Sequence, residues 1–325
     1  MGENEKGAFF GICLRRILNC GRLKCNKLNN CASNFLICFK LINQSKTKIM
    51  KKSILLLLLI SVFLANISAQ TNPIKYGDNK EVGNYKEING FKMYYEIYGS
   101  GKPLVLLHGN GGSIKGHTKR IEYFKKQFQV IAIDSRGHGK SLDPSNKQLN
   151  YNEMADDVSA LLDSLKITNA YIWGQSDGGI LGLLLAIHHP DKTEKVAVFG
   201  ANLYPGKKAV YDEIDQLVLD TLKATKNPHT KNLYTLLAKQ PNISKKDLQK
   251  IKCPVLVMSG DRDAIRLEHS IEIFDNIPNS NFFVMPGATH FGAYEKPELF
   301  NLIVTSFYND PFKKTSTVDI FTGKK

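Results

Sequence analysis

The sequence predicts an α/β fold in which a mostly parallel central sheet is covered by helices on both faces and carries a small helical cap. Short apolar runs alternate along the chain with longer segments whose apolar residues recur at helical spacing. Strands that alternate with helices pair in parallel, because each helix returns the chain to the same end of the sheet. One polar, lysine-rich interval at about residues 202–252 interrupts this alternation and is too long for a simple crossover.

The individual elements follow one another from residue 85 onward. Residues 85–88 and 91–98 flank Asn89-Gly90, a dipeptide typical of a type I′ hairpin, so antiparallel strands should open the sheet at one edge. Further strands are predicted at 103–107, 130–134, 170–173, 196–199, 255–258 and 282–285. Helices are predicted at 114–128, 151–165, 178–188 and 297–307. We interpret residues 85–309 as one globular domain with a helical cap at about 202–252, followed by a polar tail at 310–325.

The segment before this domain has the pattern of a secretory signal peptide. Residues 50–69 begin with Met-Lys-Lys, continue with an apolar run too short for a comfortable transmembrane helix, and end in small and polar residues. We therefore expect translation to begin at Met50, residues 1–49 to be a spurious extension, and residues 70–84 to be a linker. The mature protein would then be secreted or periplasmic. The alternative is a genuine extension, with the apolar run acting as a signal anchor.

The net charge of +14 does not indicate a surface for nucleic acid. Residues 1–49 hold nine Lys/Arg and two Asp/Glu, a net of +7, and Lys51 and Lys52 add two more; the remaining +5 is spread without a long basic run. Five of the six cysteines also precede residue 50, and their spacings fit neither a zinc site nor a disulfide framework. We expect no metal, no cofactor, no nucleic-acid partner and no stable membrane insertion after signal cleavage.

Residues 171–179, YIWGQSDGG, predict a nucleophilic serine. A G-x-S-x-G string alone is a weak signal, but here it follows an apolar strand and opens an apolar helix, which is the context of a nucleophile elbow. The glycines permit a tight turn that lifts the hydroxyl of Ser176 above the sheet. The helix N-terminus also favours the negative charge that develops during attack.

A serine hydroxyl needs a base, and the base needs a carboxylate to orient it. His290 is the expected base, because it follows the last predicted strand in Gly-Ala-Thr-His. Asp263 is the expected carboxylate, with Asp261 as the open alternative, since both follow the strand at 255–258. The chain order serine, aspartate, histidine is that of one particular class of serine hydrolases.

Acyl transfer also requires donors for the oxyanion that forms on the attacked carbonyl. We assign one to the backbone N–H of Asp177, directly after the nucleophile. The other is assigned to the N–H of Asn110 in the loop His-Gly-Asn-Gly-Gly at 108–112, with Gly111 as the alternative. Together these residues predict a serine hydrolase that cleaves a small ester or amide through an acyl-enzyme intermediate, so its partner is a small-molecule substrate.

These motifs together resemble the α/β-hydrolase-fold enzymes over about residues 85–308. The stretch 173–202 is further similar to the valacyclovirase (biphenyl-hydrolase-like) amino-acid ester hydrolases, although Gln175 replaces an aromatic residue. In that group the aspartate after the nucleophile is implicated in binding the α-amino group of the substrate. The resemblance therefore implies this role for Asp177, which matches it; the alternative is that Asp177 only supplies its backbone N–H.

Proteins of the same fold also perform other functions. Haloalkane dehalogenases and epoxide hydrolases use an aspartate nucleophile and are excluded by Ser176. Carbon–carbon bond hydrolases and cofactor-free haloperoxidases keep a serine and stay open, as does a non-catalytic small-molecule binder, because a fold does not determine a function. An anchoring role would depend on residues 1–70 alone.

Overall fold

The computed structural model describes residues 74–145 and 147–323. The predicted extension at 1–49 and the predicted signal peptide at 50–69 lie outside the described residues. Within the part that is described, no helix combines the length and apolar character needed to cross a membrane.

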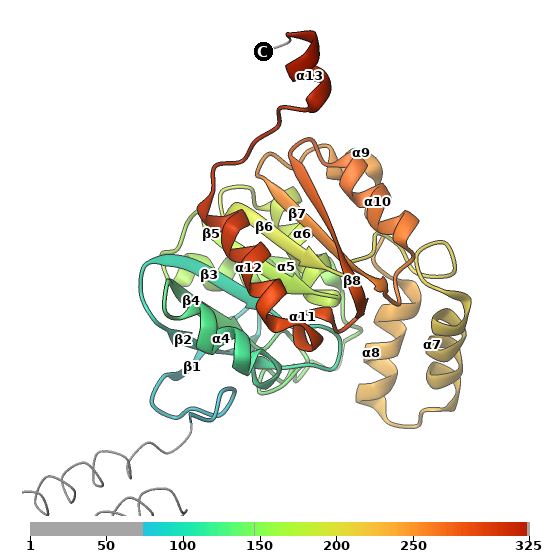
Figure 1. Ribbon diagram of the computed structural model, residues 1–325. Helices are drawn as coiled ribbons and strands as arrows, with labels where there is room; N and C mark the ends of the chain where they lie inside the picture. The colour runs from blue at the N-terminus through green and yellow to red at the C-terminus, as the bar shows by residue number, and fades with distance from the viewer. Residues whose placement is uncertain (1–73, 146, 324–325) are drawn as a thin grey trace, which may run out of the picture. The chain divides into compact units, whose positions relative to one another are not determined.

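The described chain contains a single eight-stranded sheet in the order β1-β2-β4-β3-β5-β6-β7-β8 (Figure 1). The strands are β1 Gly83–Ile88, β2 Phe91–Tyr98, β3 Lys102–Leu107, β4 Phe128–Ile133, β5 Ala170–Gln175, β6 Thr193–Phe199, β7 Val255–Arg262 and β8 Ser280–Thr289. β1 and β2 are antiparallel to their neighbours, and the other strands are parallel. Asn89 and Gly90 both have positive φ, 45° and 86°, as a type I′ turn requires. The predicted mostly parallel sheet with an antiparallel edge is confirmed.

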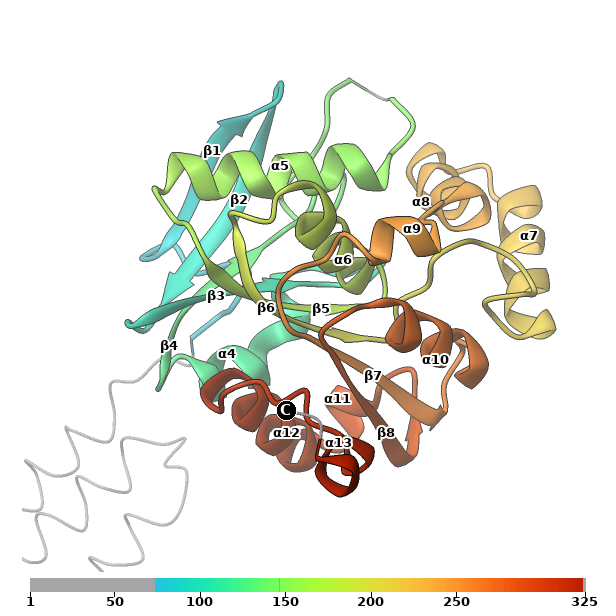
Figure 2. The ribbon, with the colours of Figure 1, turned by 90° about the horizontal axis from the view of Figure 1, so that it is seen from above.

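Helices cover both faces of this sheet (Figures 1 and 2). One face carries α5 Tyr151–Ser164, α6 Asp177–His188 and α10 Leu267–Asn276; the other carries η1 Ile114–His117, α4 Thr118–Phe124, α11 Gly292–Glu295 and α12 Pro297–Asn309. The helix predicted at 114–128 is shorter than expected. It ends at Phe124 because Phe128 already pairs with Lys102 as the first residue of β4, so the chain must turn between them. Helix α10 was not among the predicted elements.

Alternation along the strands divides the apolar residues between two cores. Val105 and Leu107 of β3 pack with α5 and α6, whereas Leu104 and Leu106 pack with α4 and α12. All four side chains are fully buried. Because successive strand residues point to opposite faces, a strand covered on both faces must be apolar throughout. This double burial holds the carboxyl ends of the central strands in fixed positions.

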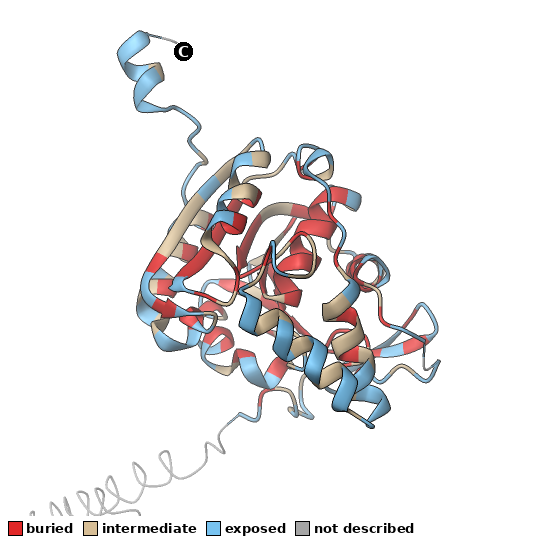
Figure 3. Cartoon of the chain, turned by 90° about the vertical axis from the view of Figure 1, so that its right-hand side faces the viewer, coloured by how far each residue is buried: buried red, intermediate tan, exposed pale blue. Residues whose placement is uncertain are grey.

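The interval between β6 and β7 contains three helices, α7 Asp212–Ala224, α8 Pro228–Lys239 and α9 Lys245–Leu248. α8 inserts Leu233 and Leu236 into the core on the α6 side, whereas α7 contains no buried residue. Figure 3 shows this largely exposed surface on the side of the molecule that carries α7 and α8. The short helix α13, Thr317–Thr322, has no buried residues and lies in the predicted polar tail.

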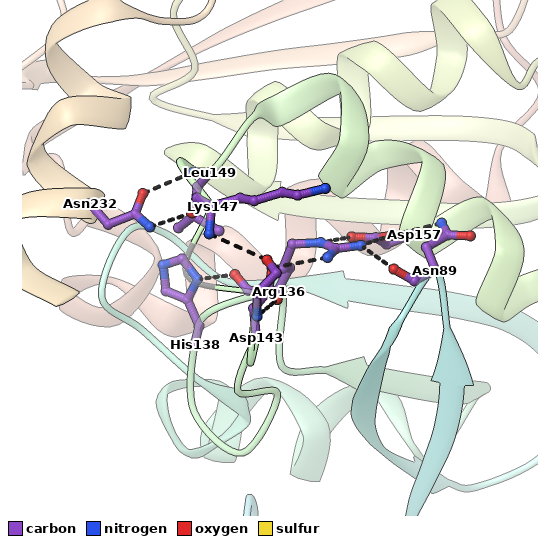
Figure 4. A network of polar contacts seen from close by, with 9 residues as sticks. Asn89, Arg136, His138, Asp143, Lys147, Leu149, Asp157 and Asn232 are labelled. Atoms are coloured by element: carbon purple, nitrogen blue, oxygen red, sulfur yellow. Dashed lines mark hydrogen bonds and ion pairs between the residues drawn. The ribbon is translucent and has the colours of Figure 1, made fainter. Parts of the chain in front are cut away.

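A polar network ties the loop after β4 to three neighbours (Figure 4). The guanidinium of Arg136 donates two hydrogen bonds of 2.7 Å to the carboxylate of Asp157 on α5, and a third of 3.0 Å to Asp143. Asn89 of the hairpin turn donates to the same Asp157 at 2.8 Å. On the cap side, the amide of Asn232 in α8 accepts the N–H of Leu149 at 2.8 Å. The cap is therefore attached to the same loop that leads into α5.

Candidate active site

Ser176, the predicted nucleophile, lies in a tight turn between a strand and a helix. Ser176 lies between the end of β5 and the start of α6 with φ 54° and ψ −120°, a conformation that side-chain-bearing residues rarely adopt. A Cβ on Gly174 would lie 2.0 Å from the carbonyl oxygen of Gly178, and a Cβ on Gly178 would lie 2.1 Å from that of Leu107. Both flanking glycines are required, because strand and helix backbones approach too closely for any side chain.

Asp263 and His290 are brought together by the register of β7 and β8. The two strands run in parallel, and their last paired residues are Arg262 and Thr289. Asp263 directly follows Arg262, and His290 directly follows Thr289. The Nδ1 atom of His290 lies 2.6 Å from Oδ1 of Asp263. This contact assigns the proton to Nδ1, where it is donated to the carboxylate, and leaves Nε2 free to accept a proton.

The carboxylate of Asp263 is held by several donors. Oδ1 also accepts the N–H of Ile265 at 3.1 Å, and Oδ2 accepts the N–H of Gly260 at 3.2 Å. Burial of the side chain acts to raise its pKa, but the hydrogen bond and charge of His290 and these backbone donors outweigh burial, so the pKa lies below the usual value. Asp263 is thus kept ionised beside the imidazole.

Asp261, the alternative carboxylate, lies elsewhere. Its side chain is more than one third exposed, and Oδ1 accepts the N–H of Ala288 at 3.2 Å instead of contacting His290. The difference arises because Asp261 precedes the end of β7, at an irregularity in the pairing between Gly260 and Arg262. The geometry therefore pairs His290 with Asp263 and not with Asp261.

The acid–base pair lies against the elbow. The N–H of Ser176 donates to the carbonyl of Phe199 at 2.8 Å, and a Cβ on the next residue, Gly200, would lie 2.6 Å from Cε1 of His290. The imidazole thus packs directly on the end of β6, beside the elbow. The side-chain amide of Gln175 also donates to the carbonyl of His290 at 2.9 Å. With 19% of its side chain exposed, His290 can be reached from solvent.

The loop 108–112 closes the site from the other side. A Cβ on Gly109 would lie 3.1 Å from Cβ of Ser176, so the loop backbone approaches the nucleophile closely. The N–H of Gly112 donates to the carbonyl of Gly109 at 3.0 Å, and Gly111 has φ 65°, which makes this a tight turn with Asn110 at its tip. The side-chain amide of Asn110 donates to Oδ2 of Asp177 at 2.9 Å.

Asp177 is the most unusual charged group of the site, because its side chain is buried. Burial raises the pKa of this carboxyl, while the hydrogen bond from Asn110 and the nearby His138 and Tyr151 act to lower it, and the net shift is upward. Its Oδ1 has no hydrogen-bond partner of normal geometry in the described structure. Sequence analysis missed Tyr151 and His138 as neighbours of this carboxylate; no local motif links the three positions.

His108 has a structural role in the same loop. Its Nε2 accepts the N–H of Ser135 at 3.0 Å, while Nδ1 lies 2.8 Å from the carbonyl of Gly109. Burial lowers the pKa of His108 to about 3, so the ring is neutral at physiological pH. A neutral ring with one donor and one acceptor satisfies both loops at once.

Elsewhere, an open pocket of about 1180 Å³ lies between the β1–β2 hairpin, the loop after β4 and α8, and its lining residues do not include Ser176, Asp263 or His290.

Comparison with known families decides the classification. The family model described as the alpha/beta hydrolase fold matches residues 102–246, which include the loop 108–112 and the elbow. Residues 102–246 thus match an α/β-hydrolase domain, and the described chain has the α/β-hydrolase fold. Its eight-stranded sheet, with one antiparallel edge and the elbow after β5, is the architecture of this family.

Individual α/β hydrolases resemble the chain over most of their length. The serine hydrolase BPHL of Mus musculus is 27% identical over 68% of this chain and 84% of its own. A 2-hydroxy-6-oxononadienedioate/2-hydroxy-6-oxononatrienedioate hydrolase of Comamonas testosteroni is 26% identical over 69% and 93%. The enol-lactonase of Burkholderia xenovorans LB400 superposes with a TM-score of 0.60 at 24% identity, covering 70% of this chain and all of that one. These relatives are hydrolases, and the protein is an enzyme of this class.

Proposed function

We propose that the protein is a serine hydrolase that cleaves a small ester or amide through an acyl-enzyme intermediate. The observation that carries this proposal is the meeting of three elements at one edge of the sheet. Ser176 follows β5 in a strained elbow, Asp263 follows β7, and His290 follows β8 within 2.6 Å of Asp263. Parallel strands bring their carboxyl ends to the same edge, so this arrangement is a consequence of the topology.

Each residue has a definite part in the proposed reaction. Nε2 of His290 accepts the proton of Ser176 as Oγ attacks the carbonyl carbon of the substrate, and it returns that proton to the leaving group. Asp263 holds the imidazole by Nδ1 and stabilises its transient positive charge. The backbone N–H groups of Asn110 and Asp177 bind the oxyanion. Water then repeats the cycle on the acyl-enzyme and releases the acid.

Replacement of the nucleophile tests this mechanism. Ser176→Ala should lower kcat on a p-nitrophenyl ester on the order of 10⁶-fold, because the acyl-enzyme cannot form. A fluorophosphonate probe should modify the wild type at Ser176 and leave the variant unmodified, as read by peptide mass spectrometry. Ser306→Ala, on the exposed surface of α12, is the matched control and should retain full activity. Activity of Ser176→Ala within tenfold of wild type would contradict the mechanism, and labelling without turnover of any ester would favour a binding protein.

A preference for α-amino-acid esters is the finer form of this proposal. It depends on Asp177, whose buried Oδ1 has no hydrogen-bond partner among the residues that the structure describes, and whose charge would attract an ammonium group in a low-dielectric site. Asp177→Asn keeps the backbone N–H and removes only the charge. It should lower kcat/KM for an amino ester about ten- to a hundredfold more than for its N-acylated counterpart. Equal losses on both esters would assign Asp177 to the architecture of the elbow and remove the amino-ester substrate from consideration.

Cleavage of a carbon–carbon bond is the second candidate. The relative from Comamonas testosteroni, whose name gives 2-hydroxy-6-oxo-dienedioates as its substrates, favours this possibility. A dienoate of this type, whose consumption is followed by absorbance, should be cleaved more slowly than simple acyl esters if the ester-hydrolase proposal is right. Faster turnover of the dienoate would assign the carbon–carbon reaction instead.

A further inference from the structure

The two side chains that flank Ser176 reach in different directions. Gln175 and Asp177 are both nearly fully buried, although both are polar. Gln175 contacts the segment that carries His290, whereas Asp177 contacts the loop 108–112 that carries Asn110. The elbow is thus bonded to both other parts of the site by side chains that take no part in the proposed acyl transfer itself.

The contact of Asp177 with Asn110 joins the two halves of the proposed oxyanion hole. The bond from Nδ2 of Asn110 to Oδ2 of Asp177 measures 2.9 Å and links positions 67 residues apart. The same two residues supply the two backbone N–H groups assigned to the oxyanion. The turn is itself closed by the bond from the N–H of Gly112 to the carbonyl of Gly109, so a bond at its tip sets the spacing of these donors. Oxyanion stabilisation depends on such preorganised spacing.

The contact of Gln175 performs the corresponding task for the base. β8 ends at Thr289, whose N–H and hydroxyl are both bound by Glu295 of α11, at 2.9 and 2.6 Å. These bonds hold the segment to its own helix and not to the elbow. The bond from Nε2 of Gln175 to the carbonyl of His290, 2.9 Å long, connects the backbone of the base directly to the nucleophile turn.

We propose that Gln175 and Asp177 are positioning residues with separate tasks: Gln175 places the base His290 relative to Ser176, and Asp177, through Asn110, places the two oxyanion donors relative to each other. This proposal rests on the serine-hydrolase function above. It explains why buried polar side chains occupy both positions next to the nucleophile, where apolar residues would avoid the desolvation of a carboxylate and an amide.

The base task is tested with Gln175→Met, which keeps the volume and removes the donor. We expect kcat to fall about ten- to a hundredfold with KM changed less than about twofold, because a displacement near 1 Å affects the reaction more than binding. The acidic limb of the kcat/KM pH profile should also move, because the bond that positions the base is lost. Asn89→Ala, in the strained hairpin turn, is the control: it should lower Tm with no change in kcat or in the pH profile.

The oxyanion task is tested with a double-mutant cycle of Asn110→Ala and Asp177→Ala. Each variant should lower kcat about ten- to a hundredfold, and the double variant should lose little more than either single one, because both remove the same bond. The inhibition constant of phenylboronic acid should rise in parallel with the loss of kcat/KM, since its tetrahedral adduct on Ser176 occupies the oxyanion site. Asp177→Asn retains an acceptor for Asn110 and should keep most of the kcat lost in Asp177→Ala. Asn110→Ser serves as a second variant if Asn110→Ala is unstable.

The pattern of results distinguishes this proposal from a general structural role. The acidic limb should move in Gln175→Met and stay in place in the Asn110 and Asp177 variants. Additive losses in the cycle, effects confined to KM, or the same pH shift in both sets of variants would overturn the division of tasks. Failure of the serine-hydrolase function would appear separately, as activity that survives in Ser176→Ala.

Discussion

Helices α6 and α7 have nearly the same length but opposite surroundings. In α6 every residue from Asp177 to Ile187 is buried, whereas α7 has no buried residue at all. α6 starts directly after Ser176, the proposed nucleophile, and packs against β3, β5 and β6, while α7 packs chiefly on its neighbour α8. Ser176 thus stands at the start of an almost entirely buried helix, whereas α7 contains only exposed and partly exposed residues.

The contrast between buried and exposed positions also separates Asp263 from Asp261, only two positions away. Here we expect the largest effect on kcat. Asp263→Asn should lower kcat about 10⁴-fold, because an amide no longer fixes the tautomer of His290 and cannot stabilise its charge. Asp261→Asn changes an exposed carboxylate that accepts a backbone N–H and lies 4.0 Å from Nε of Arg262, and should lower kcat less than about tenfold. Steady-state kinetics of the two variants on one ester compares them directly. The reverse ranking would remove Asp263 from the proposed triad.

Substitutions in α6 and α7 should differ in their effect on the free energy of unfolding as clearly as the two helices differ in burial. Leu183→Ala in α6 removes a fully buried side chain and should lower the free energy of unfolding by about 2–5 kcal/mol. Leu219→Ala in α7 removes a side chain that is 45% exposed and should change it by less than about 0.5 kcal/mol. Urea titration followed by circular dichroism measures both. Similar losses for the two variants would mean that α7 is as integral to the fold as α6.

The smallest effect concerns two histidines, one buried in the loop after β3 and one exposed on α8. The pKa of buried His108 is about 3 in the folded protein, below its ordinary value of 6.5, so the unfolded chain binds a proton first as pH falls. Its contribution to stability is complete above pH 6.5 and is lost as pH falls from 6.5 toward 3, by at most about 1.4 kcal/mol per pH unit. His108→Gln should flatten this dependence in urea titrations between pH 7 and pH 5, whereas His229→Gln, at an exposed position of α8, should leave it unchanged. An unaltered slope in His108→Gln would show that other groups cause the acid sensitivity.

Much of the fold and of the proposed site could be predicted from local sequence patterns. Alternating apolar strands and helices predicted the parallel sheet, and Asn89-Gly90 predicted its antiparallel edge, because both depend on periodicity and turn chemistry over a few residues. The elbow around Ser176 was equally predictable, since backbone crowding at Gly174 and Gly178 leaves no other residue possible there. The helix boundary near Phe124 was not, because strand pairing with β3 decides where β4 begins.

What only the tertiary structure decided are the contacts between segments far apart in the chain. The sequence favoured Asp263 and left Asp261 open as the alternative, and the register between β7 and β8 placed Asp263 beside His290. The bonds of Gln175 to His290 and of Asn110 to Asp177 span 115 and 67 residues. No local propensity specifies such pairs, since they exist only once parallel strands have brought distant loops to one edge of the sheet. The sequence by itself therefore predicted most of the strands and helices and the proposed chemistry, and their packing decided which groups meet.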